Sequence, residues 1–268
     1  MEQIRIPAVA GQFYPREQQV LSQEVARLLD AVAPSDGPQP KAIIVPHAGY
    51  IYSGRTAAAA YARLKPWGHV IRRVVLLGPC HHTAVKGLAV PSVSAFATPL
   101  DTVPLDQEAL QMLSALPQIE VNDAAHAREH SLEVQIPFLQ MVLESFVLVP
   151  LAVGCASTVS VAEVLDRLWG GDETLIVVSS DLSHFLPYSS AEIRDRMTCE
   201  AILDRDPCIN PHNACGAYPI NGLLLAAGAH GLQPELIELC NSGDTAGDKL
   251  SVVGYASFAF YPEPTYHA

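Results

Sequence analysis

Three short apolar runs, each followed by a histidine-bearing turn, constrain the fold of this 268-residue chain more than any other feature. The runs span residues 42–45, 74–77 and 175–178. Short continuous apolar runs between turn residues are typical of strands that are buried on both faces. Ligands of open α/β sheets bind beyond the carboxyl ends of such strands, so the histidines that follow these runs are expected to converge. We therefore predict a metal or acid–base centre that draws on His47, His81 and His184.

The rest of the chain alternates between helical and strand-like patterns, which predicts an α/β fold. Helices are expected at residues 17–32, 55–64, 106–116, 131–144, 159–169, 191–203 and 218–229. Further strands are expected at residues 88–90, 146–153, 235–240 and 251–261, the last of them antiparallel, whereas residues 119–128 are expected to be irregular. Because no linker or internal repeat divides the chain, residues 1–268 are expected to form a single domain.

Composition narrows the possible partners. The net charge is −12, from 16 basic and 28 acidic residues, so a nucleic-acid backbone would be repelled and nucleic acid is not an expected partner. The longest apolar stretch, residues 146–156, contains Pro150 and is shorter than the roughly 20 residues that span a bilayer, so no membrane span is expected. No secretion signal is apparent, and the six cysteines form no CxxC pair. These features favour a cytoplasmic protein with reduced thiols.

His47 and His81 are the strongest candidates for metal ligands. Both lie in turns made rigid by proline and glycine, and a metal site tolerates little positional slack. A single histidine at a strand end is more often a hydrogen-bonding residue, but two at equivalent positions on successive strands favour a site. Asp181 adds a carboxylate near His184, where it could fix the tautomer of that imidazole. The alternative is that Asp181 only caps the next helix.

Other polar residues have both functional and structural interpretations. His130 and Glu133 share a helix face at i and i+3. For His130 the functional and the structural interpretation are about equally well supported. Glu133 is expected to have a structural role. Cys215 precedes a predicted helix, whose N-terminus favours a thiolate, a soft ligand for zinc, iron or copper. Cys80 beside His81 is interpreted as a spare ligand, an oxidation liability or a small filler.

Five motifs of this chain occur in the order seen in the Memo family, whose bacterial and archaeal members include the AmmeMemoRadiSam system protein B. They are residues 46–50 (PHAGY), 78–82 (GPCHH), 129–133 (EHSLE), 179–184 (SSDLSH), and 215–216 (CG) with 219–220 (PI). The chain thus resembles this family over essentially its whole length. The resemblance implies the fold of the class III extradiol dioxygenases, an α/β sandwich around a mostly parallel central sheet.

The resemblance also implies roles for individual residues. The metal ligands would be His47, His81 and Cys215, with the cysteine where those dioxygenases have a glutamate. A thiolate favours copper or zinc as well as iron. The same pocket would be lined by three residues in catalytic roles, His184, His130 and Asp181. Tyr50 and Arg128 are expected to contact the bound ligand.

Three functions of different classes follow. The first is a redox-active metalloprotein, an oxidoreductase with Fe(II) as the expected ion and Cu or Zn as alternatives. The second is a non-catalytic adaptor that holds a small molecule or a peptide, with Arg55 and Arg128 as its cationic groups. The third is a zinc-dependent hydrolase. The family resemblance further suggests a functional link to a radical SAM protein and an AMMECR-type protein.

Overall fold

A nine-stranded sheet forms the centre of the computed structural model, which describes residues 3–34 and 36–263. Its four middle strands are parallel and lie in the order β2 (Ala42–Val45), β9 (Thr174–Ser179), β3 (Arg73–Pro79), β8 (Val147–Val153). At one side β4 (Leu88–Val90) pairs antiparallel with β8, and β7 (Ile119–Val121) pairs parallel with β4. At the other side β12 (Val252–Pro262) pairs antiparallel with β2, β10 (His184–Leu186) and β11 (Leu232–Asn241). A separate small sheet contains β1 (Ile4–Arg5), β5 (Ala95–Ala97) and β6 (Thr102–Pro104).

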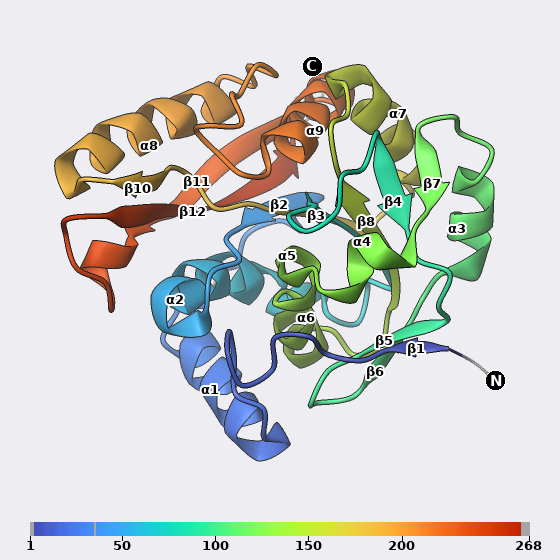
Figure 1. Cartoon of the computed structure of the whole chain (residues 1–268), viewed down its shortest axis with the longest axis horizontal. Coiled ribbons are helices and arrows are strands. Elements are labelled where there is room, and N and C mark those ends of the chain that lie inside the picture. Colours follow the sequence, from blue (N-terminus) through green and yellow to red (C-terminus); the bar gives the residue numbers. More distant parts are fainter. Residues whose placement is uncertain (1–2, 35, 264–268) are drawn as a thin grey trace.

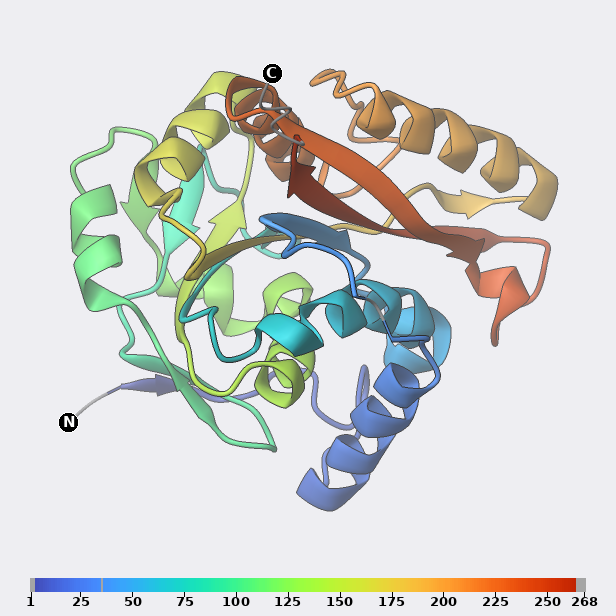
Figure 2. The same ribbon diagram turned by 180° about the vertical axis from the view of Figure 1, so that it is seen from behind.

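Helices cover both faces of the large sheet (Figure 1), and the reverse view shows the same layers (Figure 2). One layer holds α1 (Gln18–Asp30), α2 (Tyr50–Tyr61) and α6 (Ile136–Val142), and the other holds α7 (Thr158–Leu168), α8 (Tyr188–Leu203) and α9 (Ala217–Ala229). Shorter elements are α3 (Gln107–Leu113), α4 (Asp123–Ala127), α5 (His130–Glu133), η1 (Ala62–Trp67) and η2 (Ser242–Asp244). This layered arrangement confirms the predicted α/β sandwich. None of the described helices is long and apolar enough to cross a membrane.

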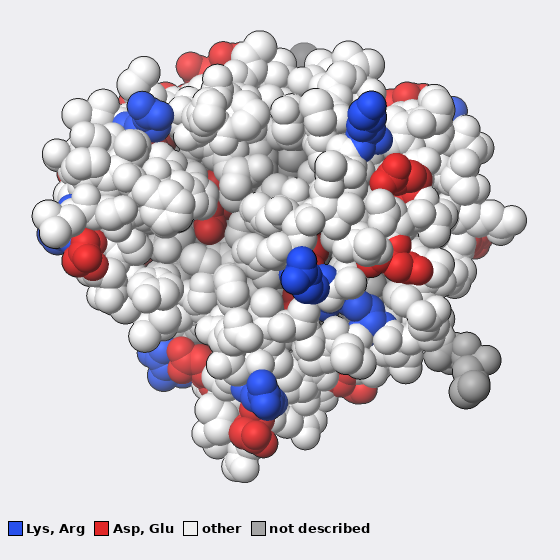
Figure 3. Space-filling view, viewed as in Figure 1, with Lys and Arg blue, Asp and Glu red and all other residues white. Residues whose placement is uncertain are grey.

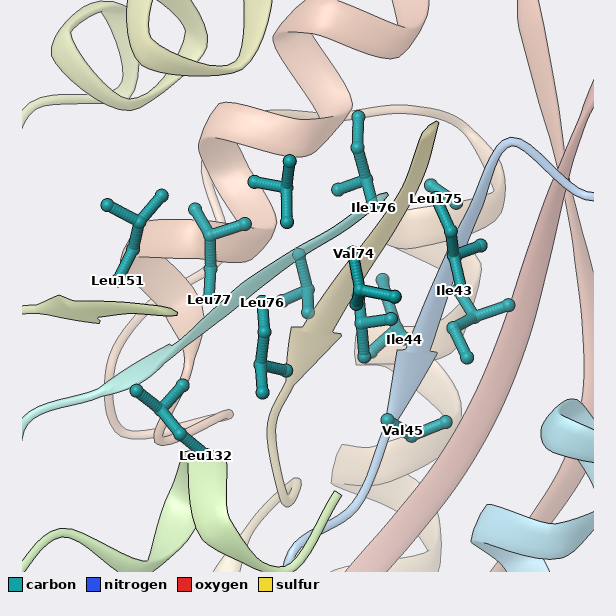
Figure 4. Packing of buried hydrophobic residues seen from close by; sticks show 14 of the residues in the cluster. Ile43, Ile44, Val45, Val74, Leu76, Leu77, Leu132, Leu151, Leu175 and Ile176 are labelled. Atoms are coloured by element: carbon teal, nitrogen blue, oxygen red, sulfur yellow. The ribbon is translucent and has the colours of Figure 1, made fainter. Parts of the chain in front are cut away.

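The core explains why the middle strands are continuously apolar. Side chains of β2, β3 and β9 point to both faces of the sheet and pack under the helices (Figure 4). Ile43, Val74 and Ile176 are fully buried. Burial of one such side chain contributes about 1.5–3 kcal/mol, so a polar residue in these strands would be costly on either face.

Most predicted elements are confirmed, but the prediction of one continuous helix over residues 131–144 is wrong. It is broken into α5 and α6, with residues 134 and 135 between them. Pro137 lies in the first turn of α6, where its missing N–H costs nothing. A continuous helix would instead place the Pro137 ring against the carbonyl of Glu133.

Two further local predictions are wrong. Residues 119–128 were expected to be irregular, but they form β7 and α4. The strand β7 is short and is stabilised by its pairing with β4. The local sequence around residues 119–121 does not indicate this partner. The prediction of a turn at His184 is also wrong, because His184 begins the short edge strand β10.

Candidate metal centre

The carboxyl ends of three parallel strands bring the predicted residues to one edge of the sheet. Register pairs Val45 of β2 with Ser179 of β9, and Leu77 of β3 with Val178 of β9. His47, His81 and Asp181 each lie two residues beyond the end of their strand. The predicted convergence of His47 and His81 at this edge is therefore confirmed.

The helix α5 adds a third imidazole to this edge. The Ser131 hydroxyl donates a hydrogen bond of 2.9 Å to the carbonyl of Pro79. Gly78 permits this approach, because a Cβ at that position would lie 2.7 Å from Ser131 Oγ. As a result, ligand atoms of His47, His81 and His130 all lie within 4.8 Å of one another. This spacing allows the three imidazoles to hold a divalent metal ion.

His47 is held as a neutral imidazole whose unprotonated Nε2 faces the site. It is 2 % exposed, and burial lowers its pKa to about 3. The Ser179 hydroxyl donates to the carbonyl of Ser131 at 2.6 Å, so it accepts from His47 Nδ1 at 2.9 Å. Gln135 also donates to Ser179 Oγ, at 2.9 Å. The proton of His47 therefore resides on Nδ1, and the lone pair of Nε2 faces the site.

Glu129 orients His81 in the same way. Its Oε1 lies 2.9 Å from His81 Nδ1, and its Oε2 accepts the His81 backbone N–H at 2.6 Å. Burial of Glu129 raises its pKa, but the hydrogen bonds from the side chain and backbone of His81 and from the N–H of Ser131 contribute to outweighing it, so the pKa falls to about 2. Because Glu129 is ionised, His81 Nδ1 donates to it and Nε2 is left as the metal-binding atom. A histidine supported by a carboxylate is a recurrent feature of metal sites.

His130 is the third member of the cluster. Burial and the neighbouring His47 lower its pKa to about 4, so it is neutral at pH 7. Its ring stacks on that of His81 with centroids 4.9 Å apart, and the ring of Phe13 lies 4.6 Å away. Its Nδ1 is 3.6 Å from Glu129 Oε1.

Cys215 and Asp181 lie beside His47. The Cys215 Sγ is 3.3 Å from His47 Nε2 and accepts the Asp181 backbone N–H at 3.3 Å. Gly216 allows the approach, since a Cβ there would lie 2.6 Å from the Cβ of Ser180. Burial and the Asp181 charge raise the pKa of the Cys215 thiol. Within the described residues Cys215 belongs to no set of three donors at the 4.8 Å spacing, so its role as third ligand stays a prediction.

Asp181 fixes the His47 turn rather than pairing closely with its ring. Its Oδ1 accepts the His47 backbone N–H at 2.7 Å, whereas its Oδ2 is 4.0 Å from His47 Nε2. Burial raises the pKa of this carboxyl, and the hydrogen bond from His47 and the charge of His184 lower it in part. His184 is half-buried on β10, and it does not belong to the set of three imidazoles found among the described residues. Its predicted acid–base role remains a prediction.

The two predicted ligand-contacting residues have different surroundings. Tyr50 is 6 % exposed and its hydroxyl donates to the carbonyl of Val134 at 2.7 Å. Arg128 is exposed, directly after α4 and two residues before His130. The predicted contacts of Tyr50 and Arg128 with a bound ligand therefore stay predictions. Figure 3 shows the face of the molecule seen in Figure 1, which is hollowed near its middle and has a small acidic patch inside the hollow.

Sequence reasoning missed the residues that orient the imidazoles. Glu129, Ser179 and Gln135 are all buried and bond to ligand side chains or to one another. Glu129 could have been found, because it lies next to His130 in a dense polar cluster that precedes an apolar segment. Gln135 had no comparable signal, since its partners are remote in sequence.

The fold and the imidazole cluster define an α/β protein with a candidate metal centre. The family model described as "Memo-like protein" matches residues 5–259. A MEMO1 family protein of Aquifex aeolicus is 36% identical over 271 residues, covering 96% of this chain and 99% of that protein. A second MEMO1 family protein, from Methanopyrus kandleri, is 34% identical over 284 residues, covering 96% of this chain and 98% of that protein. The chain therefore belongs to the Memo-like family, as its motifs indicated.

A solved structure supports the fold independently. The uncharacterized protein JW3007 from Escherichia coli K12 matches with a TM-score of 0.52, covering 82% of this chain and 99% of that one. Its sequence identity is 13%, so the likeness concerns the fold alone.

Proposed function

We propose that this chain is a metal-dependent oxidoreductase that holds one divalent ion, Fe(II), between His47 and His81. The supporting observation is the set of imidazole donors within 4.8 Å of one another. Two candidates for a third ligand lie beside these residues, His130, which belongs to that set, and the thiol of Cys215, whose Sγ is 3.3 Å from His47 Nε2. Iron is the ion implied by the resemblance to the class III extradiol dioxygenases, and a thiolate ligand would also suit copper.

The residues present fit such an ion. His47 and His81 each have Nδ1 engaged by a neighbouring oxygen at 2.9 Å, which leaves Nε2 for coordination. Both His47 and His130 are neutral at pH 7, so no proton has to be displaced from them. A bound ion would supply Lewis-acid and redox chemistry to a small organic ligand.

The other polar residues then have defined tasks. His184 would transfer protons to or from the bound ligand, since it is only half-buried. Asp181 holds the His47 turn, because its Oδ1 accepts the backbone N–H of His47 at 2.7 Å. Arg128, which is exposed, would attract an anionic group of the ligand.

Metal analysis of protein purified without oxygen tests this proposal. We expect about one iron per chain in the wild type and loss of most of it in His81→Ala. His130→Ala and Cys215→Ala decide which side chain is the third ligand, because only the ligand's variant should lose the ion. His212→Ala, at an exposed histidine outside the cluster, is the matched control and should retain full metal. Folded wild type that binds no metal, or His81→Ala with unchanged metal, would contradict the proposal.

A second candidate function, zinc-dependent hydrolysis, is favoured by the same three imidazoles. Three protein ligands and a water form a recurrent catalytic zinc site. In that case zinc rather than iron would copurify, and the protein would hydrolyse ester or amide probes only in its zinc form. Turnover that requires iron and oxygen would reject this alternative. An adaptor role for a peptide, and a link to a radical SAM protein and an AMMECR-type protein, stay predictions.

A further inference from the structure

The segment before α1 is tied to the metal centre by a buried carboxylate. We call residues 5–14 the N-terminal strap. Glu133, which is fully buried, accepts hydrogen bonds from Arg5 Nη1 at 2.6 Å and from the Tyr14 hydroxyl at 2.5 Å. It also accepts the backbone N–H groups of Ala8 at 2.8 Å and Val9 at 3.0 Å. One side chain of α5 thus anchors the strap along most of its length.

Arg5 extends this anchor to the neighbouring short helices. Its Nε donates to the carbonyl of His126 at 2.9 Å, and its Nη2 donates to the carbonyl of Glu129 at 2.8 Å. The residue is 8 % exposed. The strap is therefore fixed to the same piece of backbone that carries Glu129 and His130, and breaking a buried pair of this kind leaves an uncompensated charge.

The end of the strap reaches the imidazole cluster. The carbonyl of Phe13 accepts the Tyr50 backbone N–H at 2.8 Å, and the Phe13 ring lies 4.6 Å from the His130 ring. His47 and His81 are oriented by hydrogen bonds to Nδ1 at 2.9 Å. Within the described part of the chain His130 forms no such bond, and its contact with Glu129 is 3.6 Å. The orientation of its ring therefore depends on packing against aromatic neighbours.

We propose that the N-terminal strap positions His130 at the metal centre, with Phe13 as the positioning residue and Glu133 as the anchor of the strap. This inference rests on the proposed function, because it assumes that the cluster binds a metal. Without the Phe13 ring, the neighbouring imidazoles, among them the stacked His81, would restrain His130 less tightly, so it would sample more rotamers that metal binding would have to restrict. Loss of a hydrogen-bonding partner that orients a metal ligand typically costs about 10–100-fold in metal affinity, and loss of the Phe13 ring contact is expected near the lower end of that range.

Phe13 can be varied without disturbing the anchor. It is half-buried and also lines a groove of about 780 Å³ beside α1 and α2. Phe13→Ala removes the ring, whereas Phe13→Tyr keeps it and can place the added hydroxyl in the groove. Phe146→Ala is the matched control. Phe146 is also half-buried, but it lies just before the amino end of β8, whereas the metal centre lies at the carboxyl ends of the parallel strands.

Co(II) titration of the full chain, followed by visible absorption, is the test, since the absorption bands of Co(II) report its ligands and their geometry. We expect Phe13→Ala to raise the Co(II) dissociation constant about 10-fold or more and to change the bands. Phe13→Tyr should match the wild type. Phe146→Ala should bind Co(II) with the wild-type spectrum even if it is less stable. Glu133→Gln should change the spectrum like Phe13→Ala, and if it does not fold, Tyr14→Phe tests the anchor instead.

The outcomes separate this inference from the proposed function. If the wild type binds Co(II) and His130→Ala alters the binding, but Phe13→Ala has wild-type affinity and spectrum, the strap does not position His130 and only the inference is overturned. The same holds if Phe146→Ala changes the spectrum as much as Phe13→Ala does. If folded wild type binds no Co(II), Fe(II) or Zn(II), the proposed function itself fails, and the inference fails with it.

Discussion

Glu129→Gln is the most informative single substitution at the candidate metal centre. The carboxylate is 1 % exposed and accepts three N–H groups, His81 Nδ1 at 2.9 Å, the His81 backbone at 2.6 Å and the Ser131 backbone at 2.9 Å. Glutamine has nearly the same shape, but its amide nitrogen must face at least one of these donors. The substitution therefore tests the charge and the acceptor capacity of Glu129 with little change in packing.

The expected loss has two parts. A buried donor without an acceptor costs about 1–3 kcal/mol, and the remaining bonds lose the extra strength of a charged acceptor. Together these effects should lower the free energy of unfolding of the metal-free protein by about 2–4 kcal/mol. Because His81 loses the partner that fixes its tautomer, metal affinity should also fall about 10–100-fold.

Urea denaturation in the presence of a chelator measures the first effect, and competitive zinc titration measures the second. Glu144→Gln is the control, because Glu144 is exposed and its ion pair with Arg72 spans 3.7 Å, so its effect should stay below about 1 kcal/mol. If Glu129→Gln binds zinc within about twofold of the wild type while remaining folded, Glu129 does not prepare His81 for coordination.

Three further predictions concern other parts of the molecule. Burial lowers the pKa of His126 to about 4, so the unfolded state binds the proton more readily and stability should fall by about 3 kcal/mol between pH 6.5 and pH 4. His126→Gln should remove this part of the pH dependence in urea denaturation series, and an unchanged slope would reject the assignment. Gly216→Ala should destabilise the protein by more than 1 kcal/mol, because the added Cβ would lie 2.6 Å from the Cβ of Ser180, and a wild-type melting temperature would contradict this. Leu76→Ala should lower the free energy of unfolding by about 2–5 kcal/mol, since Leu76 is fully buried in β3. A melting temperature close to that of the wild type would contradict this and show that neighbouring side chains fill the cavity.

The fold was predictable where burial determines residue choice directly. The strands β2, β3 and β9 are covered on both faces, so nearly every position must be apolar and the pattern is visible in the chain itself. The break at Pro137 was missed although proline is a strong local signal, because the apolar residues around it continue across the break. The strand β7 could not be predicted, because it depends on its pairing with β4 about 30 residues earlier in the chain.

The site was predictable in the same uneven way. His47 and His81 could be identified because the ends of parallel strands share one edge of the sheet. The inclusion of His130 in the donor set could not, because it depends on how closely α5 approaches β3 at Gly78. The tautomers of the imidazoles depend likewise on partners such as Ser179, which is 132 residues from His47 in the sequence.

The amino-acid sequence by itself determined which segments become buried strands and which chemical groups stand directly after them, because side-chain burial and turn formation are local properties of the chain. Only the tertiary structure decided which of those groups meet, which nitrogen of each imidazole is free, and how residues 5–14 come to lie against His130. These properties depend on hydrogen bonds and ring contacts between distant segments, such as Arg5 with Glu133 across 128 positions. Such contacts form only when the helices have packed on the sheet, and no local pattern encodes their geometry.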